Sequence, residues 1–151
     1  MDISEDFREL CELLNSQGAE YVIVGGYAVG FHGAPRFTAD IDFFVRPTEQ
    51  NYTRIVAALE AFGFGSVGLT LDEFLLPGRI IQIGVEPNRV DLITSITGVS
   101  WEEADRGKVA GQYGGVPVFY IGRQELLKNK AASARKKDLA DVEALDRKGT
   151  R

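Results

Sequence analysis

The sequence is poor in residues that form cross-links: it has one cysteine, Cys11, and one histidine, His32. One cysteine cannot form an internal disulfide, and one histidine leaves no Cys/His set for zinc. A bound metal ion would therefore have to be held by carboxylates. A chain of 151 residues can do without cross-links, because it buries about 68–70% of its unfolded surface. We expect His32 to make a local hydrogen bond rather than to act as a catalytic base.

Long apolar runs and a basic leader are also missing. The apolar stretches are short, and the first six residues are acidic rather than basic and then apolar. This pattern predicts no membrane span and no signal peptide, and with the cysteine count it favours the cytoplasm. The net charge of −5 disfavours a protein that coats nucleic acid with a basic face. The length and the 44% apolar content are typical of a single domain over 1–151.

One basic segment interrupts this acidic chain. From Lys128 to Lys137 the sequence reads Lys-Asn-Lys-Ala-Ala-Ser-Ala-Arg-Lys-Lys. A cluster of this kind can bind phosphates. Charge runs on helices are common, however, and taken alone the segment favours a solvated helix face.

Apolar periodicity predicts a mixture of helices and strands. Helices are predicted over 4–17, 27–31, 48–62, 71–75, 122–134 and 136–147. Strands are predicted over 21–24, 41–45, 79–83, 89–93 and 116–121. We expect an α/β (α+β) fold with a mixed central sheet of about five strands flanked by helices. The strands 79–83 and 89–93 are expected to be antiparallel neighbours.

Two aspartates share one face of a predicted strand. In Asp40-Ile41-Asp42, side chains two residues apart point the same way, with Cα atoms about 6.5–7 Å apart. Like charges this close raise each other's pKa unless a cation or hydrogen-bond donors compensate. Mg²⁺ would compensate, because it prefers oxygen ligands and usually holds substrate phosphates as well. A solvent-facing pair at a sheet edge is the alternative.

A third aspartate, Asp91, lies in an apolar predicted strand, where an uncompensated carboxylate is costly. If this strand lies beside the strand of Asp40 and Asp42, the three aspartates converge and could hold one or two divalent ions. A strand-end aspartate paired with Arg89 or Arg79 explains the pattern equally well.

Gly25-Gly26 follows the strand 21–24 and precedes a predicted helix. A turn of this kind exposes backbone N–H groups and the positive end of a helix dipole, and both attract phosphate. The pair is neither GxGxxG nor a Walker loop, so a tight turn is the ordinary interpretation.

The order of these features resembles the nucleotidyltransferase superfamily typified by DNA polymerase beta: Gly25-Gly26, then Asp40-Ile41-Asp42, then Asp91 within a strand. The segment from Tyr21 to Val45 is similar to small bacterial nucleotidyltransferases related to the AbiEii toxins and to minimal nucleotidyltransferases. This likeness extends to the end of the chain, and it implies a nucleotidyltransferase fold.

The resemblance implies a role for each matched residue. Gly25 and Gly26 would hold the triphosphate, although many active relatives have serine where this chain has Gly26. Asp40, Asp42 and Asp91 would bind two magnesium ions, or manganese, and Asp91 would also help to activate the attacking hydroxyl. The other residues implied at the nucleotide site are Arg36, Thr38, Lys130, Asp138 and Asp141.

Two of these residues have a plainer alternative. Lys130 could be an exposed helix lysine. Asp138 could be a carboxylate that favours the dipole of the last helix.

The implied activity is metal-dependent transfer of a nucleotidyl group from an NTP to a hydroxyl, with release of pyrophosphate. The acceptor stays open among tRNA or other RNA, a protein side chain, and a small antibiotic such as an aminoglycoside or a lincosamide. The resemblance also implies a toxin–antitoxin component, with an antitoxin-type protein or a second copy of the chain as partner. A catalytically inactive nucleotide-binding or partner-neutralising module is the competing hypothesis.

Overall fold

The protein is described by a computed structural model that covers residues 3–34, 37–64, 68–84 and 88–149. Its helices are α1 (Glu5–Ser16), α2 (Gly25–Phe31), α3 (Glu49–Phe62), α4 (Leu71–Leu75), α5 (Trp101–Gly107), α6 (Arg123–Ser133) and α7 (Lys136–Gly149). Its strands are β1 (Tyr21–Val24), β2 (Asp40–Val45), β3 (Ile80–Ile83), β4 (Arg89–Ile93), β5 (Val109–Tyr113) and β6 (Val116–Tyr120). None of the helices in these ranges is both long and apolar enough to cross a membrane.

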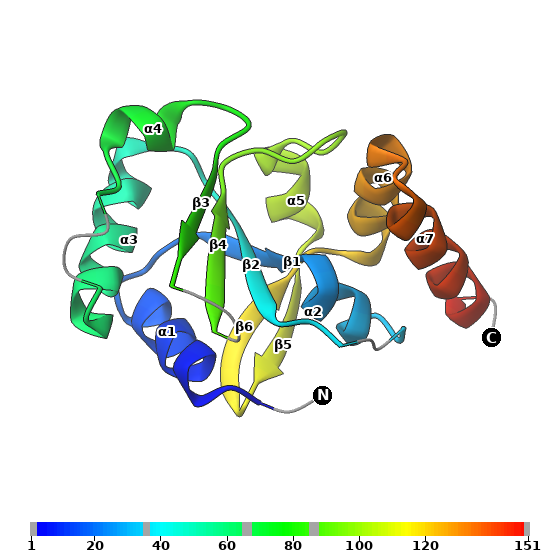
Figure 1. Ribbon diagram of the computed structural model, residues 1–151, viewed down its shortest axis with the longest axis horizontal. Helices are drawn as coiled ribbons and strands as arrows, with labels where there is room; N and C mark the ends of the chain where they lie inside the picture. Colours follow the sequence, from blue (N-terminus) through cyan, green and yellow to red (C-terminus); the bar gives the residue numbers. More distant parts are fainter. Residues whose placement is uncertain (1–2, 35–36, 65–67, 85–87, 150–151) are drawn as a thin grey trace.

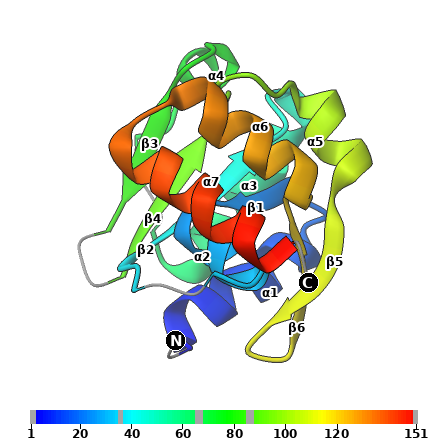
Figure 2. The same cartoon turned by 90° about the vertical axis from the view of Figure 1, so that its right-hand side faces the viewer.

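The six strands form one mixed sheet in the order β3-β4-β2-β1-β6-β5. β1 is antiparallel to β2 and parallel to β6, whereas β2 is parallel to β4. β3 and β5 pair antiparallel with β4 and β6 and form the two edges. Helices α1 and α3 lie on one side of the sheet and α6 and α7 on the other (Figure 1). Figure 2 shows α6 and α7 crossing the side that faces the viewer. The predicted fold class, a mixed sheet flanked by helices, is confirmed.

The predicted elements form where the apolar pattern placed them. Helix α1 buries Phe7, Leu10 and Leu14 against the sheet, and Ser4 caps it by accepting a hydrogen bond from the Phe7 N–H. The cap compensates one of the N–H groups that a helix start leaves unpaired. The antiparallel pairing expected for the strands around residues 80 and 90 is confirmed by β3 and β4.

Two elements, α5 and β5, are additional to those predicted. The start of α5 carries a capping box, in which Ser100 and Glu103 bond each other's backbone N–H, so the sequence does hold a helix signal there. Tyr113 is the only buried residue of strand β5, so the strand lacks the alternation of apolar and polar residues that predicts a strand. It is defined by its pairing along β6. The sheet therefore has six strands rather than about five. Trp101, the first residue of α5, is buried in the core.

A buried asparagine joins α3 to the ends of two strands. The Asn51 side chain is fully buried, and its oxygen accepts a hydrogen bond from the Glu20 N–H at 2.7 Å. Its amide nitrogen donates to the carbonyl oxygens of Glu20 and Arg46, each at 2.9 Å. Glu20 precedes β1 and Arg46 follows β2, so one side chain fixes α3 relative to the antiparallel pair that carries Asp40 and Asp42.

Replacing Asn51 by alanine should lower the free energy of unfolding by roughly 2–4 kcal/mol, because buried backbone groups lose their hydrogen-bond partners. Urea unfolding measures the loss. Thr53→Ala is the matched control, since the Thr53 hydroxyl donates to the Glu49 carbonyl on the exposed side of the same helix. Equal losses in the two variants would contradict the role given to Asn51.

Candidate functional site

The acidic residues come from two neighbouring parallel strands. β2 and β4 pair in register, with Asp40 opposite Arg89 and Asp42 opposite Asp91. Because alternate residues of a strand share a face, these four side chains lie on one face of the sheet. Ile41, on the opposite face, is fully buried. The condition on which convergence of the three aspartates depended, that these two strands lie side by side, is met.

Burial and like charge act together on Asp42. The neighbouring Asp91 is only 7% exposed. Burial, then a hydrogen bond and repulsion from Asp91, then the charge of Asp40, raise the pKa of Asp42 from its ordinary value of 3.8 to about 7. Arg89 acts in the opposite direction. A carboxyl in this setting takes up a proton near neutral pH unless a cation replaces it.

Arg89 is a counter-ion on this face. Its Nη2 donates a hydrogen bond to Asp40 Oδ2, and its Nε lies 3.2 Å from Asp91 Oδ1. With this pairing in place, the described ranges contain no group of three His, Cys, Asp or Glu arranged to hold a metal ion. The donor chemistry nevertheless fits a hard divalent cation, because three carboxylates share one half-buried face.

The first glycine of the pair lies directly beside Asp42. Gly25 opens α2 with a φ of +69°, and a Cβ at this position would collide with the Asp42 carboxylate. Both the left-handed backbone and the close approach require glycine here. The turn therefore brings backbone within contact distance of the acidic face.

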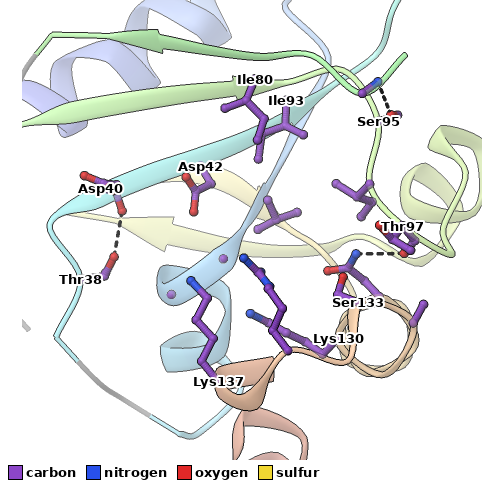
Figure 3. Close-up of a pocket in the computed structure, with 18 residues that line it drawn as sticks. Thr38, Asp40, Asp42, Ile80, Ile93, Ser95, Thr97, Lys130, Ser133 and Lys137 are labelled. Carbon is purple, nitrogen blue, oxygen red and sulfur yellow. Dashed lines mark hydrogen bonds between the residues drawn. The ribbon is translucent and has the colours of Figure 1, made fainter. Parts of the chain in front are cut away.

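The second glycine lies against Thr38. A Cβ on Gly26 would lie 2.8 Å from the Thr38 Cβ, so Thr38 fills the space that a serine at this position would need. The Thr38 hydroxyl donates to the Asp40 carbonyl oxygen at 3.1 Å (Figure 3). The departure from serine thus has a steric reason in this chain.

A pocket of about 710 Å³ opens over the acidic face, a volume within the range of small-ligand sites. Asp40 and Asp42 face it from β2, and Lys130 and Lys137 approach it from α6 and α7 (Figure 3). Asp91 lies beside Asp42 but is not among the lining residues.

Further lining residues make one charged and one uncharged wall. Arg135 adds to the cations of α6 and α7. The uncharged wall comes from β3, β4, the segment just before β3 and the segment after β4, and it carries backbone, hydroxyl and apolar groups and no charged side chain. Its residues are Gly78, Ile80, Ile93, Ser95, Ile96 and Thr97.

The ammonium of Lys130 is held by two buried carboxylates. Its Nζ lies 3.1 Å from Asp141 Oδ2 and 3.4 Å from Asp138 Oδ1, and the three residues are 5%, 6% and 0% exposed, respectively. Arg135 Nε adds a hydrogen bond to Asp138 Oδ2 at 2.6 Å. Lys130 is therefore not the exposed helix lysine of the alternative interpretation. The cluster ties α7 to α6, and direct contact of Asp138 and Asp141 with a nucleotide stays a prediction.

The basic segment divides between surface and pocket. Lys128 forms an exposed ion pair with Glu103 of α5 at 2.6 Å, as a solvated face would. Lys130, Arg135 and Lys137 line the pocket instead. Lys128 therefore fits the interpretation as a solvated helix face. The other three cations are placed as the phosphate-binding interpretation requires, because α6 and α7 meet at the pocket rim.

Three further residues complete the comparison with the predicted site. Arg36 lies outside the described residues. His32 makes a hydrogen bond, but not a local one: its Nε2 lies 2.7 Å from the carbonyl oxygen of Ile121, which is 89 residues further along the chain. In the sequence analysis, Arg89 entered only as an alternative partner of Asp91. The signal for it was available, because Arg89 lies two residues before Asp91 on a strand and the two side chains therefore share a face.

Solved structures with this fold are known, although no protein-family model and no curated protein matches the chain. Lincosamide antibiotic adenylyltransferase LnuA, with lincomycin bound, has a TM-score of 0.60 at 14% identity, over 97% of this chain and 98% of that one. Antibiotic-resistance factor ANT(2'')-Ia has a TM-score of 0.58 at 14% identity, over 93% and 80%. Its complex with adenylyl-2''-tobramycin has a TM-score of 0.54 at 14% identity, over 92% and 84%.

These neighbours are an antibiotic adenylyltransferase and an antibiotic-resistance factor that was also solved with an adenylylated antibiotic. At this level of identity the likeness establishes a shared fold. The chain therefore has the nucleotidyltransferase fold that the glycine and aspartate pattern implied.

Replacing Lys130 by methionine should lower the free energy of unfolding by about 3 kcal/mol or more, because two buried carboxylates lose a common cation. Lys128→Met should cost less than about 1 kcal/mol, since its ion pair with Glu103 is exposed. Urea unfolding of both variants measures the difference. Similar small losses would show that the Lys130 cluster does not hold α7 in place.

The metal-free protein should lose stability as the pH rises from about 4 to about 7. The pKa of Asp42 is higher in the folded state, at about 7, than its ordinary value of 3.8. The folded state therefore binds more protons across this window, and the free energy of unfolding falls as they are released. In EDTA, we expect the free energy of unfolding of the wild type to fall by on the order of 2 kcal/mol across this window. The fall should be smaller for Asp42→Asn. Parallel pH profiles for the two proteins would contradict this.

Proposed function

We propose that the chain transfers a nucleotidyl group from a nucleoside triphosphate to a hydroxyl acceptor, with release of pyrophosphate. The observation that carries this proposal is the register of β2 and β4, which sets Asp42 opposite Asp91 beside Asp40. Three carboxylates on one half-buried face are costly for a module that needs no cation. This cost disfavours the inactive nucleotide-binding or partner-neutralising alternative, and the fold shared with nucleotidyltransferases supports the enzyme.

The acidic face would hold one or two Mg²⁺ ions, with Mn²⁺ as a possible substitute, through Asp40, Asp42 and Asp91. When bound, such ions neutralise phosphate charge and lower the pKa of an attacking hydroxyl. Asp91 would help to activate the acceptor hydroxyl for attack on the α-phosphorus by holding an ion together with Asp40 and Asp42. The attacking oxygen forms the new P–O bond as the bond to pyrophosphate breaks, and the acceptor proton leaves toward the carboxylates.

The other walls would bind the substrate. The backbone at Gly25 and Gly26 would approach the triphosphate, where a larger residue at 25 would collide with Asp42. Lys137 and Arg135, held near the pocket by the Lys130 cluster, would supply positive charge to the leaving phosphates. Fixed charges of this kind provide much of the catalysis in phosphoryl transfer.

The charges of the pocket narrow the acceptor class. Among the described lining residues the only carboxylates are Asp40 and Asp42, and the proposal assigns both to metal. A polycationic acceptor such as an aminoglycoside would face Lys137, Arg135 and Lys130, and the carboxylates beside them, Asp138 and Asp141, are already paired with Lys130 and Arg135. Uncharged or anionic hydroxyl acceptors, RNA among them, fit better. The apolar part of the uncharged wall, at Ile80, leaves a small antibiotic of the lincosamide kind as a second candidate, and LnuA has this fold.

The biological setting rests on the sequence resemblance alone. The AbiEii-like pattern supports a cytoplasmic toxin-like enzyme with an antitoxin-type partner or a second copy of the chain. Such a partner would also supply acceptor recognition beyond the pocket.

Incubation with α-labelled NTPs, magnesium and one acceptor at a time tests the proposal. The acceptors are total tRNA, soluble protein, lincomycin and tobramycin. We expect label in an uncharged or anionic acceptor, and a decrease of about 100-fold or more in Asp42→Ala and Asp91→Ala, because the metal loses a ligand. Asp105→Asn is the control, since Asp105 pairs with Lys108 outside the pocket.

Two outcomes would count against the proposal. Nucleotide binding without label in any acceptor would favour the inactive module. Labelling that survives in Asp42→Ala and Asp91→Ala would show that these carboxylates do not hold the catalytic ions.

A further inference from the structure

Four charged side chains form a two-by-two set on one face of β2 and β4. Asp40 lies opposite Arg89, and Asp42 lies opposite Asp91. Arg89 contacts two of the three carboxylates at once: Nη2 donates to Asp40 Oδ2, and Nε lies 3.2 Å from Asp91 Oδ1. One guanidinium therefore bridges the two strands at the point where the proposed ions would bind.

This bridge takes up oxygen atoms that a divalent cation would need. The side chains of Arg89, Asp40 and Asp91 are 28%, 20% and 10% exposed, so the ion pairs are only partly screened by water. In the absence of metal, the arrangement neutralises part of the charge of the acidic face.

The guanidinium and a divalent cation compete for the same carboxylates. Mg²⁺ binds carboxylate oxygens at about 2.0–2.1 Å in a strict octahedron, so a bound ion would draw Asp40 and Asp91 away from their contacts with Arg89. Two positive groups a few ångströms apart also repel each other. Arginine is long and flexible, and the partly exposed Arg89 can move its head toward solvent while its stem stays in contact with the sheet.

We propose that Arg89 is a positioning residue that holds Asp40 and Asp91 in the metal-free protein and releases them when a divalent cation binds. The inference rests on the proposed function, because it assigns the ions to the same carboxylates. Arg89 thereby keeps the acidic face together when it is empty and sets the threshold at which metal enters.

Binding of Mn²⁺, followed by the electron paramagnetic resonance signal of the unbound ion, tests the inference without any turnover. In Arg89→Gln we expect binding at least tenfold tighter than in the wild type, because the competing cation is gone. Arg89→Lys should lie between the two, since it keeps the charge but loses the bidentate geometry. Arg46→Gln is the matched control: Arg46 pairs with Glu20 at 3.0 Å at the other end of β2 and should bind as the wild type does.

Thermal unfolding in EDTA and in saturating Mg²⁺ is a second test of the role of Arg89. Arg89→Gln should melt below the wild type in EDTA, because Asp40 and Asp91 lose the guanidinium that pairs with both of them. It should gain more than the wild type from Mg²⁺, since a ligand that binds only the folded state stabilises that state more at a given concentration when it binds more tightly.

Nitrogen-15 NMR of arginine side chains keeps the inference testable if Arg89→Gln does not fold. The Arg89 Nε–H signal, assigned as the one missing from Arg89→Lys, should shift on addition of Mg²⁺ to the wild type. The Arg46 signal should stay in place. An unchanged Arg89 signal at saturating Mg²⁺ would overturn the inference.

The two proposals fail in different ways. Equal or weaker Mn²⁺ binding in Arg89→Gln, with clear binding in the wild type, would overturn the role of Arg89 and leave the proposed function standing. No Mn²⁺ binding in either protein, with or without a non-hydrolysable NTP analogue, would overturn both.

Discussion

The parallel pairing of β2 with β4 is the constraint on which the site depends. The two strands are separated in the chain by α3, α4 and β3, yet their register places Asp42 opposite Asp91. Because side chains alternate between the faces of a strand, a shift of one residue would move Asp91 to the opposite face. The buried neighbours Val90 and Leu92 resist that shift, since it would bring both to the polar face. The core thus fixes the position of the acidic residues.

The charge of this face then organises what surrounds it. Arg89 pairs with two of the carboxylates from within the sheet, and the cations of α6 and α7 approach from across the pocket. Those cations depend on a second, buried cluster, in which Lys130 joins Asp138 and Asp141 and fixes the junction of the two helices. One set of opposite charges therefore forms the site, and another holds the wall that faces it.

Much of the fold follows from local patterns, and the exceptions have identifiable reasons. The helix at α1 and the strand at β1 were predictable, because their apolar periodicity is strong and their bounds carry capping or glycine signals. Strand β5 was not, since almost all of its residues lie near the surface and only the hydrogen bonds to β6 define it. For the site, spacing indicated that Asp40 and Asp42 share a face, but not which cation accompanies them.

By itself, the sequence determined which residues can form strands and helices, that any metal must be bound by carboxylates, and that glycine precedes the acidic strand. These properties are local, because they follow from residue type and from spacings of a few positions. Tertiary structure alone decided that Arg89 bridges Asp40 and Asp91, that Thr38 fills the space beside Gly26, and that Lys130 is buried. Each of these depends on which distant segments lie side by side, and that is set by the packing of the whole sheet and its helices.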